Sequence, residues 1–398
     1  MEISKNSTFL DIVTAYPGTR EYFRELGFAG VSDEGSLAGV GSTLTVETAA
    51  MLKGMDSLDL VQGIRRAAGM EITPEESTQG DYQVTGLLPC PVRIPLLEAC
   101  EAFGEEFRGR TGRGISYNLQ AAYVGLDWLK EDLDRGAGLE GLPDVFLSAG
   151  FDLFFHNSRL TQLLDRGAVG NPLAGQEQDP GNEETRRAGI LDTRGRYGVI
   201  GVVPAVFMVN TELLDGRDVP RSWEDVLSPE FADSVSLPVG DFDLFNGLLL
   251  NIYKLYGDSG LQALGRNMQS SMHPAQMVKS PPAVTILPYF FTRTIQPGSP
   301  VQAVWPREGA IVTPIFMLGT LGDPGVKGIC EFLAGRTVGE ILSHRGRFPS
   351  THSGVDNRLE SGDRFLWLGW DYLYSQDVGA LTRHAEGVFY AAARETGV

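Results

Sequence analysis

Residues 219–231 read Val219-Pro220-Arg221-Ser222-Trp223-Glu224-Asp225-Val226-Leu227-Ser228-Pro229-Glu230-Phe231 and lead into the apolar, strand-like Val235-Ser236-Leu237-Pro238. Ser222 suits the N-cap of a short helix, because its hydroxyl accepts a hydrogen bond from a backbone N–H of the first turn that has no partner in the helix. Glu224 and Asp225 fall in that turn, where the helix dipole favours negative charge, and Pro229 stops the helix. The stretch therefore predicts a capped helical turn in front of a strand.

Two further segments accompany this turn. Val206-Phe207-Met208-Val209-Asn210-Thr211 precedes it, and Glu308-Gly309-Ala310-Ile311-Val312-Thr313-Pro314 follows it further along the chain. Together the three segments resemble the solute-binding proteins of ABC importers, in the branch that includes the iron(III), polyamine and thiamine binders, over roughly residues 82–358. The resemblance implies the type 2 periplasmic-binding architecture. This is an α/β fold of two lobes joined by a hinge, which traps a small-molecule solute without chemistry.

Composition and charge agree with a soluble binding protein. The chain has 398 residues, of which 42% are hydrophobic and 21% charged, and this suits two or three globular domains. With 51 acidic and 33 basic side chains the formal charge is −18. Such a balance argues against nucleic acid or an anionic membrane surface as a partner.

The chain shows no segment typical of membrane insertion or export. Its longest apolar run, Val199 to Val209, contains Pro204 and is about half the length needed to span a bilayer. It begins with Met1-Glu2-Ile3-Ser4-Lys5, and a basic segment followed by an apolar run, as in an export signal, is not seen there. We therefore expect no membrane insertion and a cytoplasmic location, although relatives in the resembled family are usually exported.

Cysteine and histidine usage predicts neither a disulfide framework nor a metal site. Cys90, Cys100 and Cys330 are an odd number without paired metal spacing, and the five histidines are scattered. We expect no cofactor and no dedicated zinc site. Gly-x-Ser-x-Gly, P-loop and HExxH motifs are also missing from the sequence, which favours binding over catalysis.

The first 72 residues predict a small helical domain. Thr8 and Asp11 form a capping-box-like start, and Pro17 opens a second helix that ends at Gly27. The segment resembles the small helical domain at the N-terminus of iron–sulfur repair proteins, on Thr8, Asp11, Ile12, Tyr16-Pro17, Phe23 and Gly27-Phe28. Members often carry cysteines soon after that Gly-Phe pair, whereas this chain has Ala29, Gly30 and Val31. The domain is expected to be either an interaction or regulatory unit or a purely structural cap, without thiol chemistry.

The predicted domain order is a helical domain over 1–72, a polar linker containing proline and glycine over 73–81, and a two-lobe solute-binding domain over 82–398. Lobe 1 is expected to comprise about 82–203 and 306–398, and lobe 2 about 204–305. The chain is expected to cross between the lobes near Val202-Val203-Pro204-Ala205 and near Ala303-Val304-Trp305-Pro306. In the resembled family these crossings form the hinge.

Candidate ligand-binding residues in lobe 1 follow the predicted strands Tyr82–Leu88 and Asp144–Ser148. In open α/β sheets ligands lie beyond the carboxyl ends of the strands, where loop amides and helix N-termini converge. The candidates on these two loops are Cys90, Arg93, Ser148, Ala149 and Gly150. The alternative for each of these two loops is that it is only a tight turn and binds no ligand.

Candidates in lobe 2 lie at the start of the apolar helix Phe242 to Tyr256 and on later loops. Asp241, Asp243 and Asn246 stand where that helix begins, so their oxygens either cap it or face the cleft. The resemblance adds His273 and Tyr289, and the remaining candidates are Gly240 and Glu308. Ferric binders of the family use adjacent tyrosines near this region. Here Tyr289-Phe290-Phe291 leaves one phenol, so a chelated metal or no metal fits better than bare iron(III).

The sequence leaves the charge of the ligand open, because two sets of side chains could bind ligands of opposite charge. An anion site is possible from Arg93, Lys279, Arg293 and Arg307, and a cation or amine site from Asp241, Asp243 and Glu308. We favour a solute-binding protein for a small anionic or chelated solute, with an ABC permease as possible partner. The alternative is a cytoplasmic ligand sensor that regulates a partner protein through the helical domain.

Overall fold

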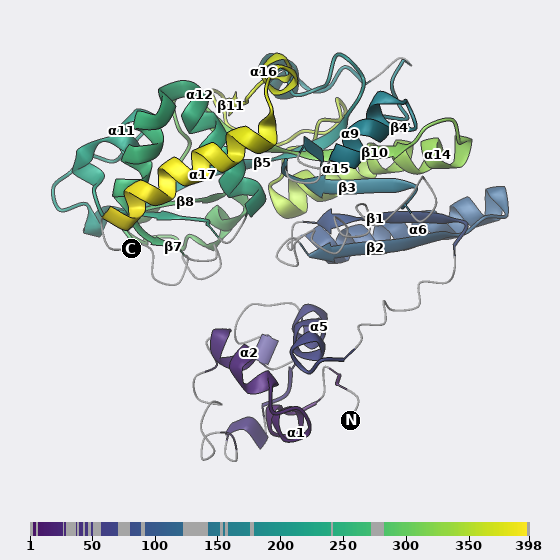
Figure 1. The fold of residues 1–398 in the computed structure, drawn as a ribbon, viewed down its shortest axis with the longest axis horizontal. Helices are drawn as coiled ribbons and strands as arrows, with labels where there is room; N and C mark the ends of the chain where they lie inside the picture. The colour runs from purple at the N-terminus through teal and green to yellow at the C-terminus, as the bar shows by residue number, and fades with distance from the viewer. Residues whose placement is uncertain are drawn as a thin grey trace. The chain divides into compact units, whose positions relative to one another are not determined.

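The structure is a computed structural model (Figure 1), and it describes residues 3–4, 7–26, 28, 37, 40–42, 44–46, 49–50, 57–70, 80–88, 92–121, 142–151, 154–155, 158–175, 179–239, 242–271 and 282–395. Contacts along the chain divide it into two compact units, Met1–Ser77 and Thr78–Val398. Each unit has its own buried core, and the two are described separately below.

The first unit is mainly helical in its described part, with one isolated antiparallel bridge between Thr8 and Thr45. It contains α1 (Phe9–Ala15), α2 (Thr19–Glu25), the 3₁₀ turn η2 (Val40–Ser42) and α5 (Ser57–Ala67). The predicted cap is present, because the backbone N–H of Asp11 donates to the Thr8 hydroxyl over 3.2 Å. Phe9 and Phe23 stack with ring centroids 4.1 Å apart in the core. α2 ends at Glu25, and the predicted stop at Gly27 lies outside the described residues.

The second unit is a mixed α/β structure. Its strands are β1 (Tyr82–Leu88), β2 (Ile115–Ala121), β3 (Val145–Ala149), β4 (Val169–Gly170), β5 (Gly198–Asn210), β6 (Val235–Leu237), β7 (Met268–Ser271), β8 (Val284–Pro288), β9 (Val301–Val304), β10 (Ala310–Thr320) and β11 (Phe365–Leu366). Its helices and helical turns are α6 (Arg93–Thr111), α9 (Ser158–Asp165), α10 (Glu183–Ala188), η5 (Thr211–Leu213), α11 (Trp223–Leu227), η6 (Pro229–Phe231), α12 (Phe242–Asn267), η7 (Tyr289–Thr294), α14 (Pro324–Leu333), α15 (Arg336–Glu340), the π-helical η8 (Ile341–Arg345), α16 (Trp370–Ser375) and α17 (Val378–Glu395).

The first lobe is built on the parallel strands β2, β1 and β3, beside which β10 runs antiparallel. Helices α6 and α14 bury their apolar side chains on one face of this sheet, and α9 packs on the other face. Gly86 permits the close approach of β1 and β3, because a Cβ there would meet the Leu147 carbonyl oxygen at 1.7 Å. The sheet is thus covered on both faces, as parallel sheets usually are.

The second lobe continues the sheet in the order β5, β8, β6 and β7. The predicted cap of α11 is present, since the Asp225 N–H donates to the Ser222 hydroxyl over 3.0 Å. Trp223 is fully buried and donates its indole N–H to the Gly309 carbonyl over 2.9 Å. Two of the segments that the sequence analysis connected, around 219–231 and 308–314, are therefore in direct contact.

Strands β5 and β10 join the two lobes. β5 pairs with β10 from Gly198 to Ala205, and from Ala205 to Val209 it pairs with β8 of the second lobe. β10 in turn pairs with β3 of the first lobe between Ile315 and Gly319. The long shared strands make the two-lobe α/β architecture and its hinge, and the fold class predicted from the sequence is confirmed.

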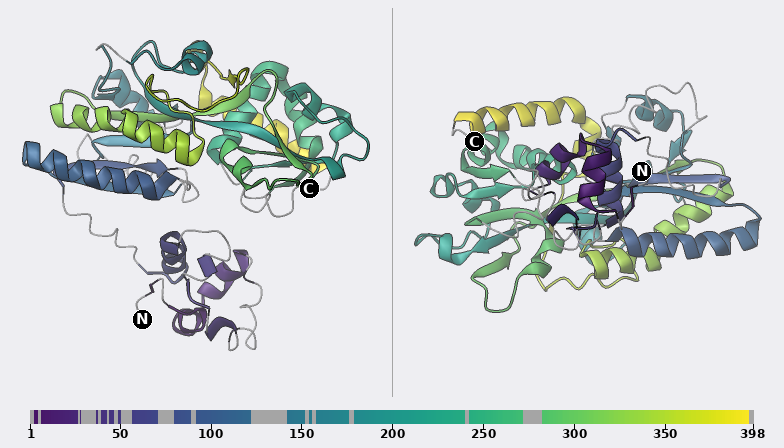
Figure 2. Two further views of the ribbon diagram at one scale, coloured as in Figure 1. Left: turned by 180° about the vertical axis from the view of Figure 1, so that it is seen from behind. Right: turned by 90° about the horizontal axis from the view of Figure 1, so that it is seen from below.

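The last helix, α17, lies along α12 of the second lobe (Figures 1 and 2). Phe245 of α12 and Phe389 of α17 have ring centroids 5.2 Å apart, and His384 Nε2 lies 2.8 Å from a carboxylate oxygen of Asp258. The sequence analysis assigned the whole of 306–398 to lobe 1. The structure instead packs α17 on lobe 2, because the apolar face of the helix is completed by the apolar face of α12.

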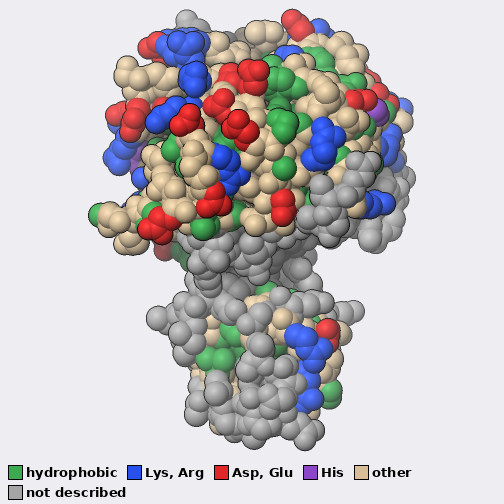
Figure 3. Space-filling view, turned by 90° about the vertical axis from the view of Figure 1, so that its left-hand side faces the viewer, with side chains coloured by type: hydrophobic (Ala, Val, Ile, Leu, Met, Phe, Trp, Pro, Cys, Tyr) green, Lys and Arg blue, Asp and Glu red, His purple; other side chains and the backbone are tan. Residues whose placement is uncertain are grey.

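The surface carries both signs of charge. On the face seen in Figure 3, acidic and basic side chains are interspersed, without one continuous basic patch. Within the part of the chain that the structure describes, no helix is both long enough and apolar enough to cross a membrane.

Candidate functional site

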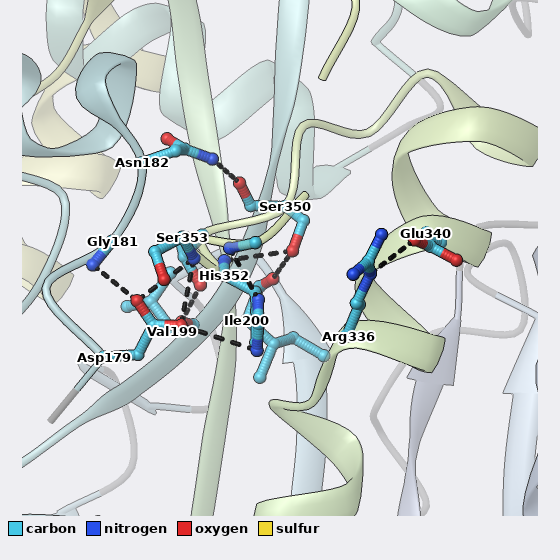
Figure 4. A network of polar contacts seen from close by, with 12 residues as sticks. Asp179, Gly181, Asn182, Val199, Ile200, Arg336, Glu340, Ser350, His352 and Ser353 are labelled. Carbon is cyan, nitrogen blue, oxygen red and sulfur yellow. Dashed lines mark hydrogen bonds and ion pairs between the residues drawn. The ribbon is translucent and has the colours of Figure 1, made fainter. Parts of the chain in front are cut away.

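A network of hydrogen bonds connects the first-lobe segment 350–357, which follows η8, to β5 near the place where the chain crosses between the lobes (Figure 4). The Thr351 hydroxyl donates to the Val199 carbonyl over 2.7 Å, and the Asn182 amide donates to the Ser350 carbonyl over 2.6 Å. Asp179 accepts hydrogen bonds from the N–H groups of Gly181 and Ser353, each at 2.9 Å. The network fixes the first-lobe segment that contains Asn357, one of the residues of the pocket described next.

The pKa of Asp179 reflects these contacts. Burial raises the pKa of this carboxyl, but hydrogen bonds from the backbone of Ser353 and Gly181 and the nearby His352 outweigh burial and hold the pKa below its usual value. His352 Nε2 lies 3.5 Å from Asp179 Oδ2. The carboxylate is therefore ionised and acts as the acceptor that orders this turn.

A pocket of about 160 Å³ lies between the two lobes. Its lining residues come from η7 of the second lobe and from η8 and the segment after it in the first lobe. They are Tyr289, Arg293, Ser343, His344, Arg347, Asn357 and Arg358. Ser343 and Asn357 are buried. Three lining residues are half-buried, namely Tyr289, His344 and Arg347. Arg293 and Arg358 are exposed at the rim. A site that both lobes line is where closure of the hinge encloses a ligand.

Local sequence explains how the second-lobe side of the pocket is presented. Pro288 ends β8 and directly precedes η7, so Tyr289 is the first residue of the turn. The Thr292 hydroxyl donates back to the Tyr289 carbonyl over 2.8 Å, which holds the turn. The phenol ring packs edge-to-face on Trp305, with ring centroids 5.2 Å apart.

On the first-lobe side, backbone geometry and one amide fix the pocket. Arg347 and Arg358 both have left-handed backbone conformations, with φ of 50° and 53°. The Asn357 side chain accepts from the Ser350 N–H over 2.8 Å and donates to the Ser350 carbonyl over 3.0 Å. The Asn357 side chain therefore holds the loop through Ser350, and Arg347 and Arg358 line the pocket beside it.

Several contacts join the lobes directly at this pocket. Arg293 Nη1 donates to the Arg345 carbonyl over 2.6 Å, and the Arg347 guanidinium donates to the Thr292 hydroxyl. The Arg347 guanidinium carbon also lies 5.0 Å from the centroid of the Tyr289 ring, within cation–π range. Beside the pocket, Phe290 and Phe348 stack with ring centroids 6.4 Å apart. The described conformation is one in which the lobes touch here.

The electrostatic character of the pocket is that of a donor site. The lining includes guanidinium, imidazole, hydroxyl and amide groups, and no carboxylate is among the residues that line it in the described structure. Burial raises the pKa of Tyr289, which the nearby Arg347 partly offsets, so the phenol is protonated and can donate. His344 Nε2 lies 2.9 Å from the Asp356 carbonyl, and since a carbonyl can only accept, this nitrogen carries a hydrogen that it donates within the protein, so the donors open to a ligand are the guanidinium groups and the hydroxyls. Such a set of groups suits an anion.

The described candidates of the first lobe do not line this pocket. Arg93 is buried and donates Nε to the Leu119 carbonyl over 3.3 Å. Ser148 is buried in β3, where its hydroxyl donates to the Ala149 carbonyl over 3.1 Å; Ala149 is buried next to it. Gly150, with φ of 89°, donates its N–H to the Pro314 carbonyl of β10 over 3.2 Å. Their contacts belong to the packing of lobe 1, and their role in ligand binding stays a prediction.

The second-lobe candidates divide in the same way. Tyr289 lines the pocket, as does Arg293, which the sequence analysis named as an anion ligand. Asn246 is buried on α12, and Glu308 accepts from the Trp223 N–H over 3.3 Å at the start of α11. Asp243 is in the first turn of α12, and nothing is described of its side chain. The candidates that lie outside the described residues are Cys90, Gly240, Asp241 and His273.

Sequence reasoning missed the first-lobe side of the pocket. The sequence feature that could have indicated it is the stretch Ser343-His344-Arg345-Gly346-Arg347, a basic run with one hydroxyl in an otherwise acidic chain. In the described part of the chain, histidine, cysteine, aspartate and glutamate side chains form no group of three or more that could hold a metal ion.

The solved structures similar to this chain include a ferric binding protein, a protein in complex with iron and citrate, and an ABC transporter protein. The ferric binding protein of Campylobacter jejuni is 11% identical over 78% of this chain and 99% of its own, with a TM-score of 0.56. A Trichodesmium protein named IdiA (FutA), solved in complex with iron and citrate, is 14% identical over 78% and 99%, with a TM-score of 0.54. An ABC transporter protein from Clostridium perfringens is 14% identical over 78% and 100%, with a TM-score of 0.53. At these identities the likeness shows the fold, and it confirms the type 2 periplasmic-binding architecture.

Sequence profiles match both units of the chain. Residues 3–61 match a domain of unknown function, DUF1858, in agreement with a separate small domain at the N-terminus. Among curated proteins, no sequence matches the chain. Residues 140–376 match the profile of the bacterial extracellular solute-binding proteins. Since that match spans more than half of the sequence, the chain belongs to the family of bacterial extracellular solute-binding proteins.

Proposed function

We propose that this protein binds a small anionic or chelated solute between its two lobes and releases it chemically unchanged. The observation that carries the proposal is the pocket shared by both lobes, in which arginine side chains and a phenol converge without a carboxylate among the described lining residues. Because guanidinium groups bind carboxylate and phosphate oxygens with charge-assisted, often bidentate hydrogen bonds, the charge of the pocket favours a negative ligand.

The hinge supplies the mechanism of capture. β5 and β10 connect the lobes, and residues of η7 approach η8 from the opposite lobe. A ligand that contacts both sides at once stabilises the closed arrangement by its differential affinity for that state. Binding and release then require only closing and opening, with no bond made or broken in the solute.

A chelated metal belongs to the same ligand class. The Campylobacter protein is described as a ferric binding protein, and the Trichodesmium protein was solved with iron and citrate. In the present chain Tyr289 is followed by Phe290 and Phe291, so a metal ion in this pocket would depend on oxygens brought by its own chelator. The negative charge of such a complex is what the arginines recognise.

The test is a thermal-shift screen of the full chain against citrate, ferric citrate, inorganic phosphate, phosphonates, thiamine and spermidine. A ligand that binds only the folded state raises the Tm in a saturable way. We expect an anion or chelate to do so, and we expect the shift to fall in Arg293→Gln and Arg358→Gln. Arg187→Gln is the matched control, because Arg187 is exposed on α10 and pairs with Glu183 away from the pocket.

Two outcomes would overturn the proposal. One is a saturable shift with spermidine or thiamine and none with any anion or chelate. The other is an anion-induced shift that is unchanged in both pocket variants, which would place binding elsewhere.

A further inference from the structure

The hydroxyl of Ser343 is the most informative group in the interlobe pocket. Ser343 is 4% exposed and lines the pocket, and its Oγ has no hydrogen-bond partner in the described structure. Serine within a helix commonly bonds the carbonyl one turn earlier, and this one does not. A buried polar group without a partner is costly, so a ligand is the natural partner for it.

The arginines around Ser343 also retain free donors. Arg293 uses Nη1 for the Arg345 carbonyl, and Arg347 uses Nη1 for the Thr292 hydroxyl. Since a guanidinium has five N–H donors, and the described residues accept from only one nitrogen of each group, the other donors can bind a ligand. These protein contacts also orient the two guanidinium groups before a ligand arrives, which reduces the entropy lost on binding.

The pocket offers few acceptors in return. The Asn357 side-chain oxygen is taken by the Ser350 N–H, and Tyr289 holds its proton because burial raises the pKa of the phenol. A bare metal cation would meet guanidinium groups and neutral hydroxyls in place of the anionic oxygens that hard metal ions prefer.

The size of the pocket limits what enters it. Its volume of about 160 Å³ is below the roughly 300–1,000 Å³ of typical small-molecule sites. The pocket therefore suits one functional group or a very small ion, with any remainder of the solute outside it.

From these observations we propose that the pocket binds a metal-free oxyanion group, a carboxylate, phosphate or phosphonate, directly through the Ser343 hydroxyl and the Arg293 and Arg347 guanidinium groups. This inference rests on the proposed function and narrows it, since a chelated metal is then not required for binding. Ser343 donates to one oxygen of the anion, and the two arginines, one from each lobe, neutralise its charge. The same ligand thus bridges the lobes.

The experiment is isothermal titration of the full chain, freed of metal with a chelating resin, with inorganic phosphate, methylphosphonate and citrate. We expect at least one of these to bind, with about tenfold weaker affinity in Ser343→Ala and a larger loss in Arg293→Gln. Ser343→Gly is a second variant in case the alanine substitution alters η8. Arg266→Gln and Arg383→Gln are controls, because these arginines line a separate groove of about 490 Å³ between α12 and α17.

The outcomes separate this inference from the function on which it rests. If ferric citrate binds and all metal-free anions fail, the oxyanion proposal is wrong while solute binding stands. If neither anions nor chelates bind, both are wrong. If a metal-free anion binds equally well to Ser343→Ala, Ser343→Gly and wild type, or loses affinity only in the Arg266 and Arg383 variants, the site is not this pocket.

Discussion

Ser222 shows how much one side chain contributes at a helix start. Its hydroxyl accepts from the Asp225 N–H, and α11 delivers Trp223 into the core beside Gly309. We predict that Ser222→Ala lowers the free energy of unfolding by about 1 kcal/mol, the usual cost of losing an N-cap. Urea denaturation measures the change, and Ser222→Asp, which restores an acceptor, is the control. A stability of Ser222→Ala equal to wild type would show that the cap is not used.

The lowered pKa of Asp179 leads us to predict that the stability of the protein depends on pH. Its pKa is lower in the folded chain than its usual value of about 3.9, so the ionised carboxylate favours folding. This contribution is complete at neutral pH and is lost as the pH falls through the lowered folded value. We therefore expect the gap in unfolding free energy between wild type and Asp179→Asn to be widest near pH 7 and to narrow in acid below about pH 4. Denaturant titrations across that range test it, and a gap independent of pH would contradict the assignment.

Individual residues also show where sequence reasoning reaches and where it stops. The caps at Thr8 and Ser222 were predictable, because capping depends on residues three positions apart. The convergence of Tyr289 with Arg347 was not, because it depends on how two lobes meet. Arg93 is a charged residue after a strand, which suggested a place in the cleft; its side chain is buried and donates to the Leu119 carbonyl, and its role in ligand binding stays a prediction.

Two glycines on the paired helices α12 and α17 predict opposite effects of the same substitution. A Cβ on Gly265 would lie 2.6 Å from the Phe389 carbonyl oxygen and 3.0 Å from Ala392 Cβ, whereas a Cβ on Gly387 would meet nothing within 4 Å. Gly265→Ala should therefore destabilise by about 1–3 kcal/mol through overpacking. Gly387→Ala should stabilise by roughly 0.5–1 kcal/mol, because alanine restricts the unfolded chain.

Urea denaturation of the two variants side by side distinguishes packing from helix propensity. If both alanines stabilise the protein, α17 does not pack on α12 as closely as the structure shows. If both alanines destabilise the protein, another group must pack closely against Gly387, contrary to the open space that surrounds it in the structure.

At the level of elements, periodicity identified strands and helices more readily than their neighbours. The apolar stretches around β1, β3 and β6 were recognised as strands, and the structure has them there. The apolar face of α17 was also visible in the sequence, but such a face does not say which surface it covers. Only the packing of Phe389 on Phe245 assigns the helix to the second lobe.

At the scale of the whole molecule, we propose that a small anion or its chelate is held between two lobes joined by β5 and β10. The fold followed from the sequence, because three short segments carry the resemblance and two of them meet at Trp223 and Gly309. The pocket did not follow, because its lining residues lie in two segments that the chain brings together only after it has crossed between the lobes.

The most direct test is a crystal structure of the full chain with the tightest anion or chelate from the titrations. We predict ligand density in contact with Arg293 and Arg347 at once, that is, with side chains from both lobes. Density confined to the groove of Arg266 and Arg383, or to one lobe alone, would contradict the account.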